Sequence, residues 1–122
     1  YIIKMKNKLK MSELRPWGNY VVIKEAENYK IKIIEVKKKG KLSYQYHNYR
    51  AETWIILEGH GEITLNGNLT SVSKGDTFII PKGEKHRIEN SGSENLKFIE
   101  VQTGTYFGED DIVRLEDKYN RR

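Results

Sequence analysis

The sequence contains no cysteine, and this absence excludes disulfide bonds and thiolate metal ligands. Any bound metal ion therefore has to be held by nitrogen and oxygen atoms. No apolar run approaches the ~20 residues that a membrane helix needs, and the lysine-rich residues 1–11 lack the apolar stretch of a secretory signal. We therefore expect a cytoplasmic protein that has no membrane partner.

The chain also lacks the features of a disordered protein. Apolar residues make up 37% and charged residues 32%, which is the balance of a soluble globular domain. Its 122 residues suffice for one apolar core and are too few for two domains. We expect one domain at residues 14–122, preceded by an extension or linker at residues 1–13.

No nucleic-acid-binding motif accompanies the positive charge of the chain. The net charge is +5, but the lysines are scattered and form no recognition helix. The same surplus of charge suits a small substrate that carries a phosphate or a carboxylate. We expect a small-molecule substrate and no nucleic-acid partner.

Short segments rich in β-branched and aromatic residues alternate with turn residues along most of the chain. Asn66-Gly67, between two such segments, is typical of a type I′ hairpin turn, which needs positive φ at both central residues. This close spacing, without a long helical period, predicts an all-β sandwich or barrel. The predicted strands are residues 20–24, 30–36, 53–57, 62–65, 77–80, 86–90 and 96–102.

One short helix is predicted at the C-terminus. Ile112, Leu115 and Tyr119 follow helical spacing. Acidic residues 109–111 precede them and two arginines at residues 121–122 follow, which is the order of charge that a helix dipole favours.

Four side chains in the middle of the chain are candidate metal ligands. Gln45 and His47 are two residues apart, so on a strand they point to the same face. Glu52 follows five residues later, and His86 comes directly after a turn at residues 81–83. If the strands close into a barrel, the four groups converge inside it. Such a ligand set favours zinc, with iron, manganese, nickel or cobalt as alternatives.

The spacing of these ligands resembles the two signature motifs of the cupin family. The residues that match the first motif, with glutamine in place of its first histidine, are Gly40, Gln45, His47, Glu52 and Gly59. Those that match the second motif are Gly75, Pro81, Gly83, His86 and Asn90. The resemblance implies a cupin double-stranded β-helix, a jelly-roll barrel, with a divalent metal inside it.

A closer resemblance covers nearly the whole chain from Arg15 onward. The matching segments are residues 15–18, 42–47, 50–52, 80–81, 86–87, 99–102 and 108–114. They resemble type II mannose-6-phosphate isomerase, the cupin domain often fused behind a mannose-1-phosphate guanylyltransferase. This resemblance implies a metal that is commonly zinc, and the interconversion of mannose 6-phosphate and fructose 6-phosphate in nucleotide-sugar biosynthesis. The Gly-rich phosphate loop of the nucleotidyltransferase half is absent from this sequence, so no guanylyltransferase activity is predicted for it.

The chain departs from the usual histidine-rich segment of that family. Asn48, Tyr49 and Thr53 stand where the family carries histidines. By spacing none of the three is a metal ligand, so metal binding is expected without them. Tyr49 and Thr53 keep a second hypothesis open, in which the chain is a non-catalytic or differently specific sugar-binding module. A third hypothesis is another sugar-modifying or oxygenase reaction at the same metal, although an oxygenase usually needs three histidines around iron.

An aldose–ketose isomerisation needs a base at carbon and positive charge near the developing oxyanion. Glu100 is the first candidate for the base. It lies with Gln102 on one predicted strand, and the even-numbered positions of that strand are predicted to face inward. The alternative is that Glu100 forms a buried ion pair with an arginine. Arg50, between two ligands, is a candidate for catalysis and for binding the phosphate.

Further candidate substrate contacts are Lys82, Lys85, Arg87 and Gln102. For each lysine the alternative is a solvated surface charge. A homodimer is also expected, because cupins often pair through exposed sheets.

Overall fold

The computed structural model describes residues 12–121. Regular structure in this range consists of strands, and most of the extension predicted at residues 1–13 lies outside it. Glu13, however, already belongs to the first strand. Among residues 12–121 there is no helix long and apolar enough to cross a membrane.

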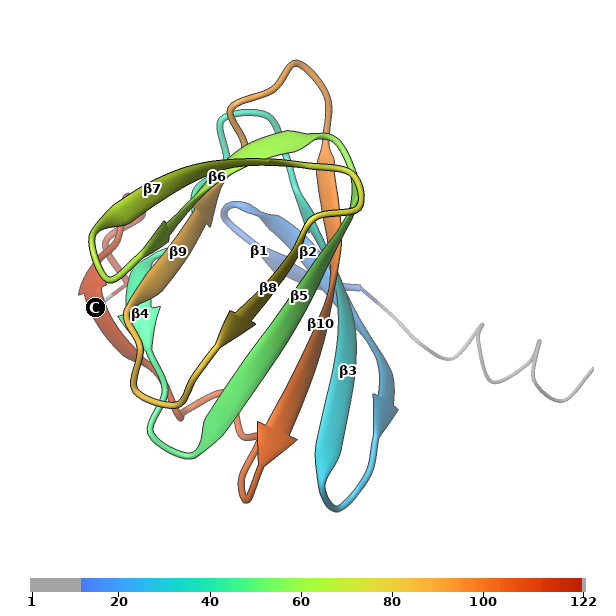
Figure 1. The fold of residues 1–122 in the computed structure, drawn as a ribbon, viewed down its shortest axis with the longest axis vertical. Helices are drawn as coiled ribbons and strands as arrows, with labels where there is room; N and C mark the ends of the chain where they lie inside the picture. Colours follow the sequence, from blue (N-terminus) through green and yellow to red (C-terminus); the bar gives the residue numbers. More distant parts are fainter. Residues whose placement is uncertain (1–11, 122) are drawn as a thin grey trace, which may run out of the picture.

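Two antiparallel sheets face one another and enclose the core, as predicted for an all-β barrel (Figure 1). The six-stranded sheet has the order β1-β2-β3-β10-β5-β8. Its strands are β1 (Glu13–Arg15), β2 (Gly18–Glu25), β3 (Tyr29–Val36), β5 (Arg50–Glu58), β8 (Thr77–Ile80) and β10 (Leu96–Gly104). The five-stranded sheet has the order β11-β4-β9-β6-β7. Its strands are β4 (Tyr44–Tyr46), β6 (His60–Leu65), β7 (Asn68–Ser73), β9 (His86–Glu89) and β11 (Val113–Glu116).

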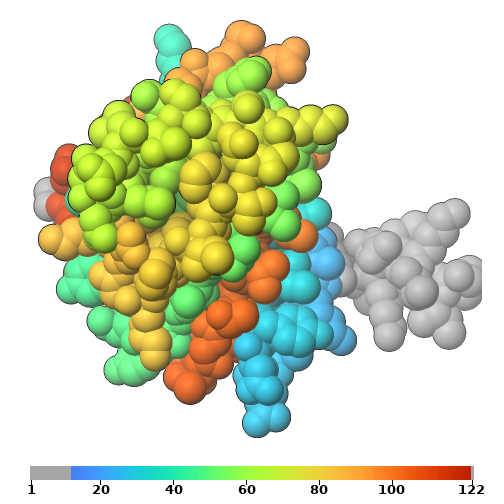
Figure 2. All heavy atoms as spheres, viewed as in Figure 1, coloured from blue at the N-terminus to red at the C-terminus, as the bar shows by residue number. Residues whose placement is uncertain are grey.

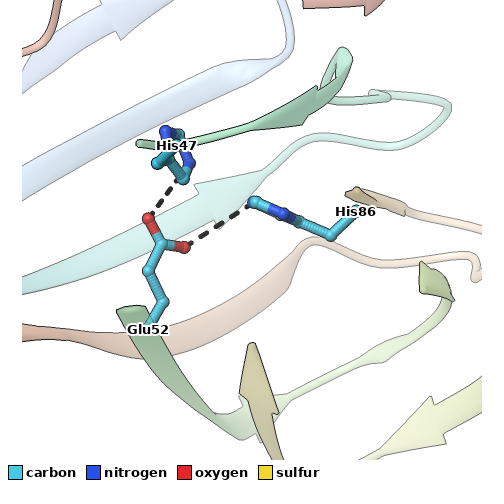
Figure 3. A group of neighbouring side chains, drawn as sticks. All are labelled: His47, Glu52 and His86. Atoms are coloured by element: carbon cyan, nitrogen blue, oxygen red, sulfur yellow. Dashed lines mark ion pairs between the residues drawn. The ribbon is translucent and has the colours of Figure 1, made fainter. Parts of the chain in front are cut away.

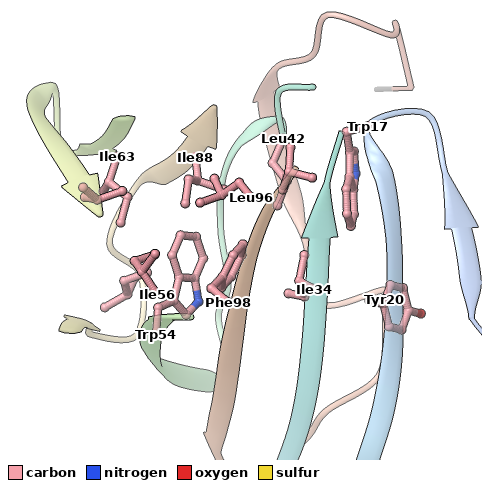
Figure 4. Packing of buried hydrophobic residues seen from close by; sticks show 13 residues of the cluster. Trp17, Tyr20, Ile34, Leu42, Trp54, Ile56, Ile63, Ile88, Leu96 and Phe98 are labelled. Carbon is pink, nitrogen blue, oxygen red and sulfur yellow. The ribbon is translucent and has the colours of Figure 1, made fainter. Parts of the chain in front are cut away.

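The apolar part of the interior is centred on Trp54 and Phe98, whose rings lie 4.7 Å apart between centroids. Ile63 and Ile88 of the five-stranded sheet pack into the same cluster (Figure 4). Side chains alternate between the two faces of each strand, so the inward positions of β5 and β10 change from apolar at one end to polar at the other. The barrel therefore has an apolar end and a polar end.

The hairpin predicted at Asn66-Gly67 is confirmed. Asn66 has φ 47° and Gly67 φ 84°, and they join β6 to β7 with Leu65 opposite Asn68. Positive φ at both central residues is the geometry that an Asn-Gly pair tolerates best.

The helix predicted from Ile112, Leu115 and Tyr119 is wrong. Val113–Glu116 forms strand β11, which pairs with β4 and covers the edge of the five-stranded sheet. A short helix here would leave the backbone groups of β4 unpaired at that edge. The hydrogen bonds that β11 forms with β4 therefore outweigh the local preference for a helix. The arginine that was expected to face the helix dipole, Arg121, instead forms an ion pair with Asp117.

Candidate metal centre

The polar end of the barrel holds the candidate ligands that the sequence suggests. Gln45 lies on β4, directly opposite His86 on β9, and His47 follows β4 by one residue. Glu52 extends from β5 in the facing sheet. Both imidazole rings point toward the Glu52 carboxylate (Figure 3). The four candidate ligands thus come from both sheets, at or directly after strands β4, β5 and β9.

The distances within this group fit a tetrahedral metal ion. His47 Nε2 lies 3.2 Å from Glu52 Oε2, and His86 Nε2 lies 3.8 Å from Glu52 Oε1. The ligand atoms of the three residues all lie within 4.8 Å of one another. Metal–ligand bonds of about 2.1 Å at tetrahedral angles would place two ligand atoms about 3.4 Å apart. The His47–Glu52–His86 cluster can therefore bind a metal ion with little movement.

Backbone carbonyls set the orientation of both imidazole rings. His47 Nδ1 lies 2.6 Å from the carbonyl oxygen of Asp111, and His86 Nδ1 lies 2.8 Å from that of Glu84. A carbonyl oxygen only accepts hydrogen bonds, so each Nδ1 carries a proton, and Nε2 is the ring nitrogen left to bind a metal ion. This is the tautomer that a metal ion bound at Nε2 requires.

Gln45 is oriented in a comparable way. Its amide nitrogen donates to the carbonyl oxygen of Ser43 at 3.2 Å and lies 3.1 Å from the Ser43 hydroxyl. Both contacts use the nitrogen, so the amide oxygen is left to bind a metal ion. The Gln45 side chain is buried and lies next to His86. An amide oxygen is the ligand that the sequence predicts at this position.

Two N–H donors fix the carboxylate of Glu52 from opposite sides. Arg50 Nε donates to Oε2 at 2.8 Å and Trp54 Nε1 donates to Oε1 at 2.9 Å. Burial acts to raise the pKa of Glu52, but the nearby His86 and Arg50 and the hydrogen bonds to its oxygens outweigh burial and hold the pKa below its usual range. Glu52 is therefore an ionised ligand.

His47 is uncharged at neutral pH. Burial lowers the pKa of His47 to about 4, with further contributions from the positive charge of Arg50 and from the neighbouring His86. A neutral imidazole is the form that binds a metal ion, so the site is ready for a ligand without the loss of a proton from His47.

Glu100 lies beside this group, on β10. It accepts hydrogen bonds from Trp54 Nε1 at 3.2 Å and from Gln102 Nε2 at 2.8 Å rather than from an arginine. Burial and the negative charge of Glu52 raise the pKa of Glu100 to about 7. Glu100 thus changes its protonation state near neutral pH, which suits a group that transfers protons.

A cavity of about 100 Å³ opens over these side chains, which is room for several water molecules. Among the residues that line it are Gln45, His47, Arg50, Glu52, His86 and Glu100. The structure thus brings together the four predicted ligands, the predicted base and the predicted arginine.

Other predicted substrate contacts lie elsewhere. Lys82 and Lys85 are exposed in the connection between β8 and β9 and do not line the cavity. Arg87 follows His86 on β9, so it points to the opposite face, where its Nε donates to the carbonyl oxygen of Leu42 at 3.1 Å. Gln102 is buried behind Glu100, which it holds in place.

The three positions where the related family carries histidines also lie outside the cavity. Tyr49 is exposed, and Thr53 alternates with Glu52 and so faces the outside of β5. The backbone N–H of Asn48 donates to a carboxylate oxygen of Asp111 at 2.8 Å. Substitution of these histidines therefore leaves the walls of the cavity unchanged.

Sequence reasoning missed several functional residues. Asp111 accepts the backbone N–H groups of Asn48 and Tyr49 with its carboxylate, while its carbonyl oxygen orients His47. Arg15 and Arg114 line the cavity from opposite ends of the chain. All three lie within the segments that carry the family resemblance, but their roles depend on where β1 and β11 pair.

Comparisons with known proteins agree with this structure. The family model described as mannose-6-phosphate isomerase C-terminal matches residues 4–117. A mannose-1-phosphate guanylyltransferase of Salmonella montevideo is 47% identical over 107 residues, which are 88% of this chain and 23% of that protein. The xanthan biosynthesis protein XanB of Xanthomonas campestris pv. campestris (strain B100) is 44% identical, with the same coverage. The chain thus spans about a quarter of the length of these relatives.

Solved structures show the same fold at low sequence identity. A Klebsiella pneumoniae protein with a double-stranded β-helix domain superimposes with a TM-score of 0.75 at 21% identity, covering 90% of this chain and 94% of its own. The cupin domain of Schizosaccharomyces pombe Cnp3 gives a TM-score of 0.68 at 18% identity, covering 77% and 68%. The predicted cupin jelly roll is confirmed.

Substitution of one ligand is expected to remove the metal while the fold remains. In His86→Ala the lone pair of one Nε2 is lost, and zinc affinity should fall by about tenfold or more. Elemental analysis of purified protein and zinc titration measure this. The matched control is His60→Ala, since His60 is exposed and lies outside the cavity. Equal zinc content in the two variants would contradict the site.

Proposed function

Since the chain belongs to the mannose-6-phosphate isomerase C-terminal family, we propose that it interconverts mannose 6-phosphate and fructose 6-phosphate with the help of a divalent metal ion, preferably zinc. The observation that carries this proposal is the buried His47–Glu52–His86 cluster with Glu100 and Arg50 beside it in one cavity. The relatives are named for mannose-1-phosphate guanylyltransferase and xanthan biosynthesis. We accordingly place the reaction in cytoplasmic nucleotide-sugar biosynthesis.

Gln45, His47, Glu52 and His86 would hold the metal. Three of these ligands are neutral and one is a carboxylate, so a divalent ion would keep a net charge near +1. When bound, the ion supplies Lewis-acid polarisation of the sugar oxygens at C1 and C2.

Arg50 adds a second positive group at the same place. Its Nε is used by Glu52, and its Nη2 lies 3.3 Å from His47 Nε2. Its Nη1 is buried without a hydrogen-bond partner in the part of the chain that the structure describes. An unpaired buried N–H group is costly, so this donor is poised for an oxygen of the substrate, where negative charge develops during proton transfer.

Glu100 is the proposed base. It lines the cavity, and Trp54 and Gln102 fix its carboxyl group by hydrogen bonds. As a carboxylate it can take the proton from C2 of the aldose, and as the acid it can return that proton to C1 of the enediol, while a proton passes from O2 to O1. A group with a pKa of about 7 exists in both forms at neutral pH.

The hypothesis of a non-catalytic sugar-binding module draws its support from Tyr49 and Thr53. Neither residue lines the cavity. The groups that the isomerisation needs are retained in this chain, and this supports the catalytic proposal over the binding module.

Turnover should depend on the metal. Purified protein is expected to convert mannose 6-phosphate to fructose 6-phosphate in an assay coupled to fructose 6-phosphate consumption. A chelator should abolish the signal and added zinc should restore it, because the ion polarises the reacting oxygens. His60→Ala serves as the active control and His86→Ala as the inactive one. No turnover by the metal-loaded wild type would exclude the isomerase.

The pH profile tests Glu100 separately. Only its carboxylate form accepts a proton, so kcat/KM should fall as the pH drops below about 7. Glu100→Gln keeps the size and shape of the side chain and removes the base, so kcat should fall by about 100-fold or more. Zinc content reports whether the metal site is intact in this variant. A variant with full zinc and wild-type kcat would show that another group is the base.

We also propose that the chain forms a homodimer through the outer face of its six-stranded sheet. On this face two neighbouring cross-strand rows are mostly aliphatic, which is unusual for a surface in water. Ile79 is 70% exposed and Ile55 36%. Residues of β3 (cyan) and β10 (orange) reach the surface side by side (Figure 2). The first row consists of Val21, Ile33, Ile99 and Ile55. The second row consists of Ile31, Val101, Thr53 and Ile79.

A two-fold axis places the same patch on both sides of the contact, so one charge per chain introduces two at the interface. Ile79→Lys should therefore convert a dimer to a monomer, as measured by light scattering after gel filtration. Leu69→Lys, at an exposed position on β7 in the other sheet, is the control and should remain dimeric. A wild-type monomer at micromolar concentration would contradict the proposal.

A further inference from the structure

Positive side chains gather at the mouth of the metal cavity, away from the His47–Glu52–His86 cluster. Arg15 of β1, Arg114 of β11 and Arg121 after β11 line the cavity and are partly exposed, while Lys32 of β3 lines it at a buried position. Glu109 is the one acidic residue that lines this part of the wall among the described residues. The mouth therefore carries a surplus of positive charge.

Most of these charges already have a partner. Lys32 Nζ lies 2.7 Å from Glu109 Oε2. The guanidinium of Arg121 donates two hydrogen bonds to the Asp117 carboxylate, at 2.8 and 3.0 Å. Neither side chain needs a ligand to satisfy its charge.

Arg114 is the exception. It has no acidic group within ion-pair distance in residues 12–121, and its Nε is buried without a hydrogen-bond partner. Burial and the positive charges of Arg121 and Arg15 lower the pKa of Arg114, and Asp117 only partly offsets them. A half-buried guanidinium without an anion costs free energy, so its place in the wall calls for a negatively charged ligand.

Strand pairing fixes the direction of Arg114. Arg114 lies opposite Gln45 in the β11–β4 pair, and Gln45 lies opposite His86 in the β4–β9 pair. Residues opposite one another project to the same face, so all three side chains point into the barrel. Arg114 stands two strand spacings, roughly 10 Å, from His86.

Arg15 faces the same space from the other sheet. Its Nη2 lies 3.2 Å from the Tyr20 hydroxyl, and its guanidinium lies 5.1 Å from the centre of the Tyr20 ring. Its nearest carboxylate, that of Glu13, is 4.0 Å away at an exposed position, where an ion pair contributes little. Arg15 is thus oriented but only weakly neutralised.

We propose that Arg114, together with Arg15, binds the phosphate group of the sugar substrate at the mouth of the cavity. The guanidinium fork matches the oxygens of a phosphate, and the phosphate supplies the anion that Arg114 lacks. The carbonyl end and the phosphate of a hexose 6-phosphate lie at opposite ends of the molecule. With the phosphate at Arg114, the reacting carbons extend toward Arg50 and the metal ligands.

This inference rests on the proposed function for the identity of the ligand, but anion binding can be measured without turnover. Titration calorimetry of the full chain with mannose 6-phosphate, inorganic phosphate and mannose separates the contribution of the phosphate from that of the sugar. Wild type should bind mannose 6-phosphate at least about tenfold more tightly than mannose. Arg114→Gln should remove this preference, and Arg114→Lys should restore part of it. The control is Lys74→Gln, which removes one exposed positive charge from the β7–β8 turn.

Thermal unfolding distinguishes a binding residue from a structural one. Without ligand, Arg114→Gln should unfold at the same temperature as wild type or higher, because an unpaired charge has been removed. Inorganic phosphate should raise the unfolding temperature of wild type and of Lys74→Gln but not of Arg114→Gln. A less stable Arg114→Gln variant that retains the preference for mannose 6-phosphate would overturn the proposal.

The two proposals fail in different ways. If the protein shows no turnover but loses phosphate binding in Arg114→Gln, the isomerase is excluded and the phosphate site stands. If it turns over and Arg114→Gln leaves the KM for mannose 6-phosphate unchanged, the isomerase stands and the phosphate site is excluded. Loss of phosphate binding in Arg87→Gln, with none in Arg114→Gln, would place the anion on the opposite side of β9.

Discussion

The buried carboxylate of Glu52 is the constraint on which the polar end of the barrel depends. An unpaired charge at this depth would cost several kcal/mol, so the surrounding residues have to compensate it. Arg50 and Trp54 donate hydrogen bonds to its two oxygens, and His47 and His86 face it from the other sheet. These contacts to the Glu52 carboxylate connect the two sheets at one point. The same geometry leaves room for a cation between the carboxylate and the imidazoles.

Trp54 connects this polar group to the apolar core. Its indole N–H donates to Glu52 and to Glu100, while its ring packs against Phe98 at 4.7 Å. The two carboxyl groups consequently share one donor and one buried environment. Their negative charges disfavour simultaneous ionisation, so Glu52 stays charged beside Arg50 and the pKa of Glu100 rises. One environment thereby keeps Glu52 ionised and brings the pKa of Glu100 close to neutral pH.

The sequence predicted what depends on strand parity and short-range turn chemistry. Gln45 and His47 share a face, and Asn66-Gly67 forms its hairpin, because both follow from neighbouring residues. The same parity rule separates Arg87 from His86, and it was available from the sequence once β9 was recognised. The C-terminal strand was missed because its pairing with β4 is non-local. The orientation of Arg114 depends on that pairing, so its role was missed as well.

β11, at the edge of the five-stranded sheet, and its neighbour β4 together build one side of the candidate site. β4 carries Gln45 and leads into His47, yet it is only three residues long, and β11 pairs with it on one side while β9 pairs on the other. Residues 108–111 lead into β11, and Asp111 in that segment holds the backbone of Asn48 and Tyr49 and orients His47. The same stretch of chain thus fixes a metal ligand through a backbone carbonyl and places Arg114 at the mouth. The proposed metal site and the proposed phosphate site are in this way determined together by the segment whose conformation is least evident from local sequence.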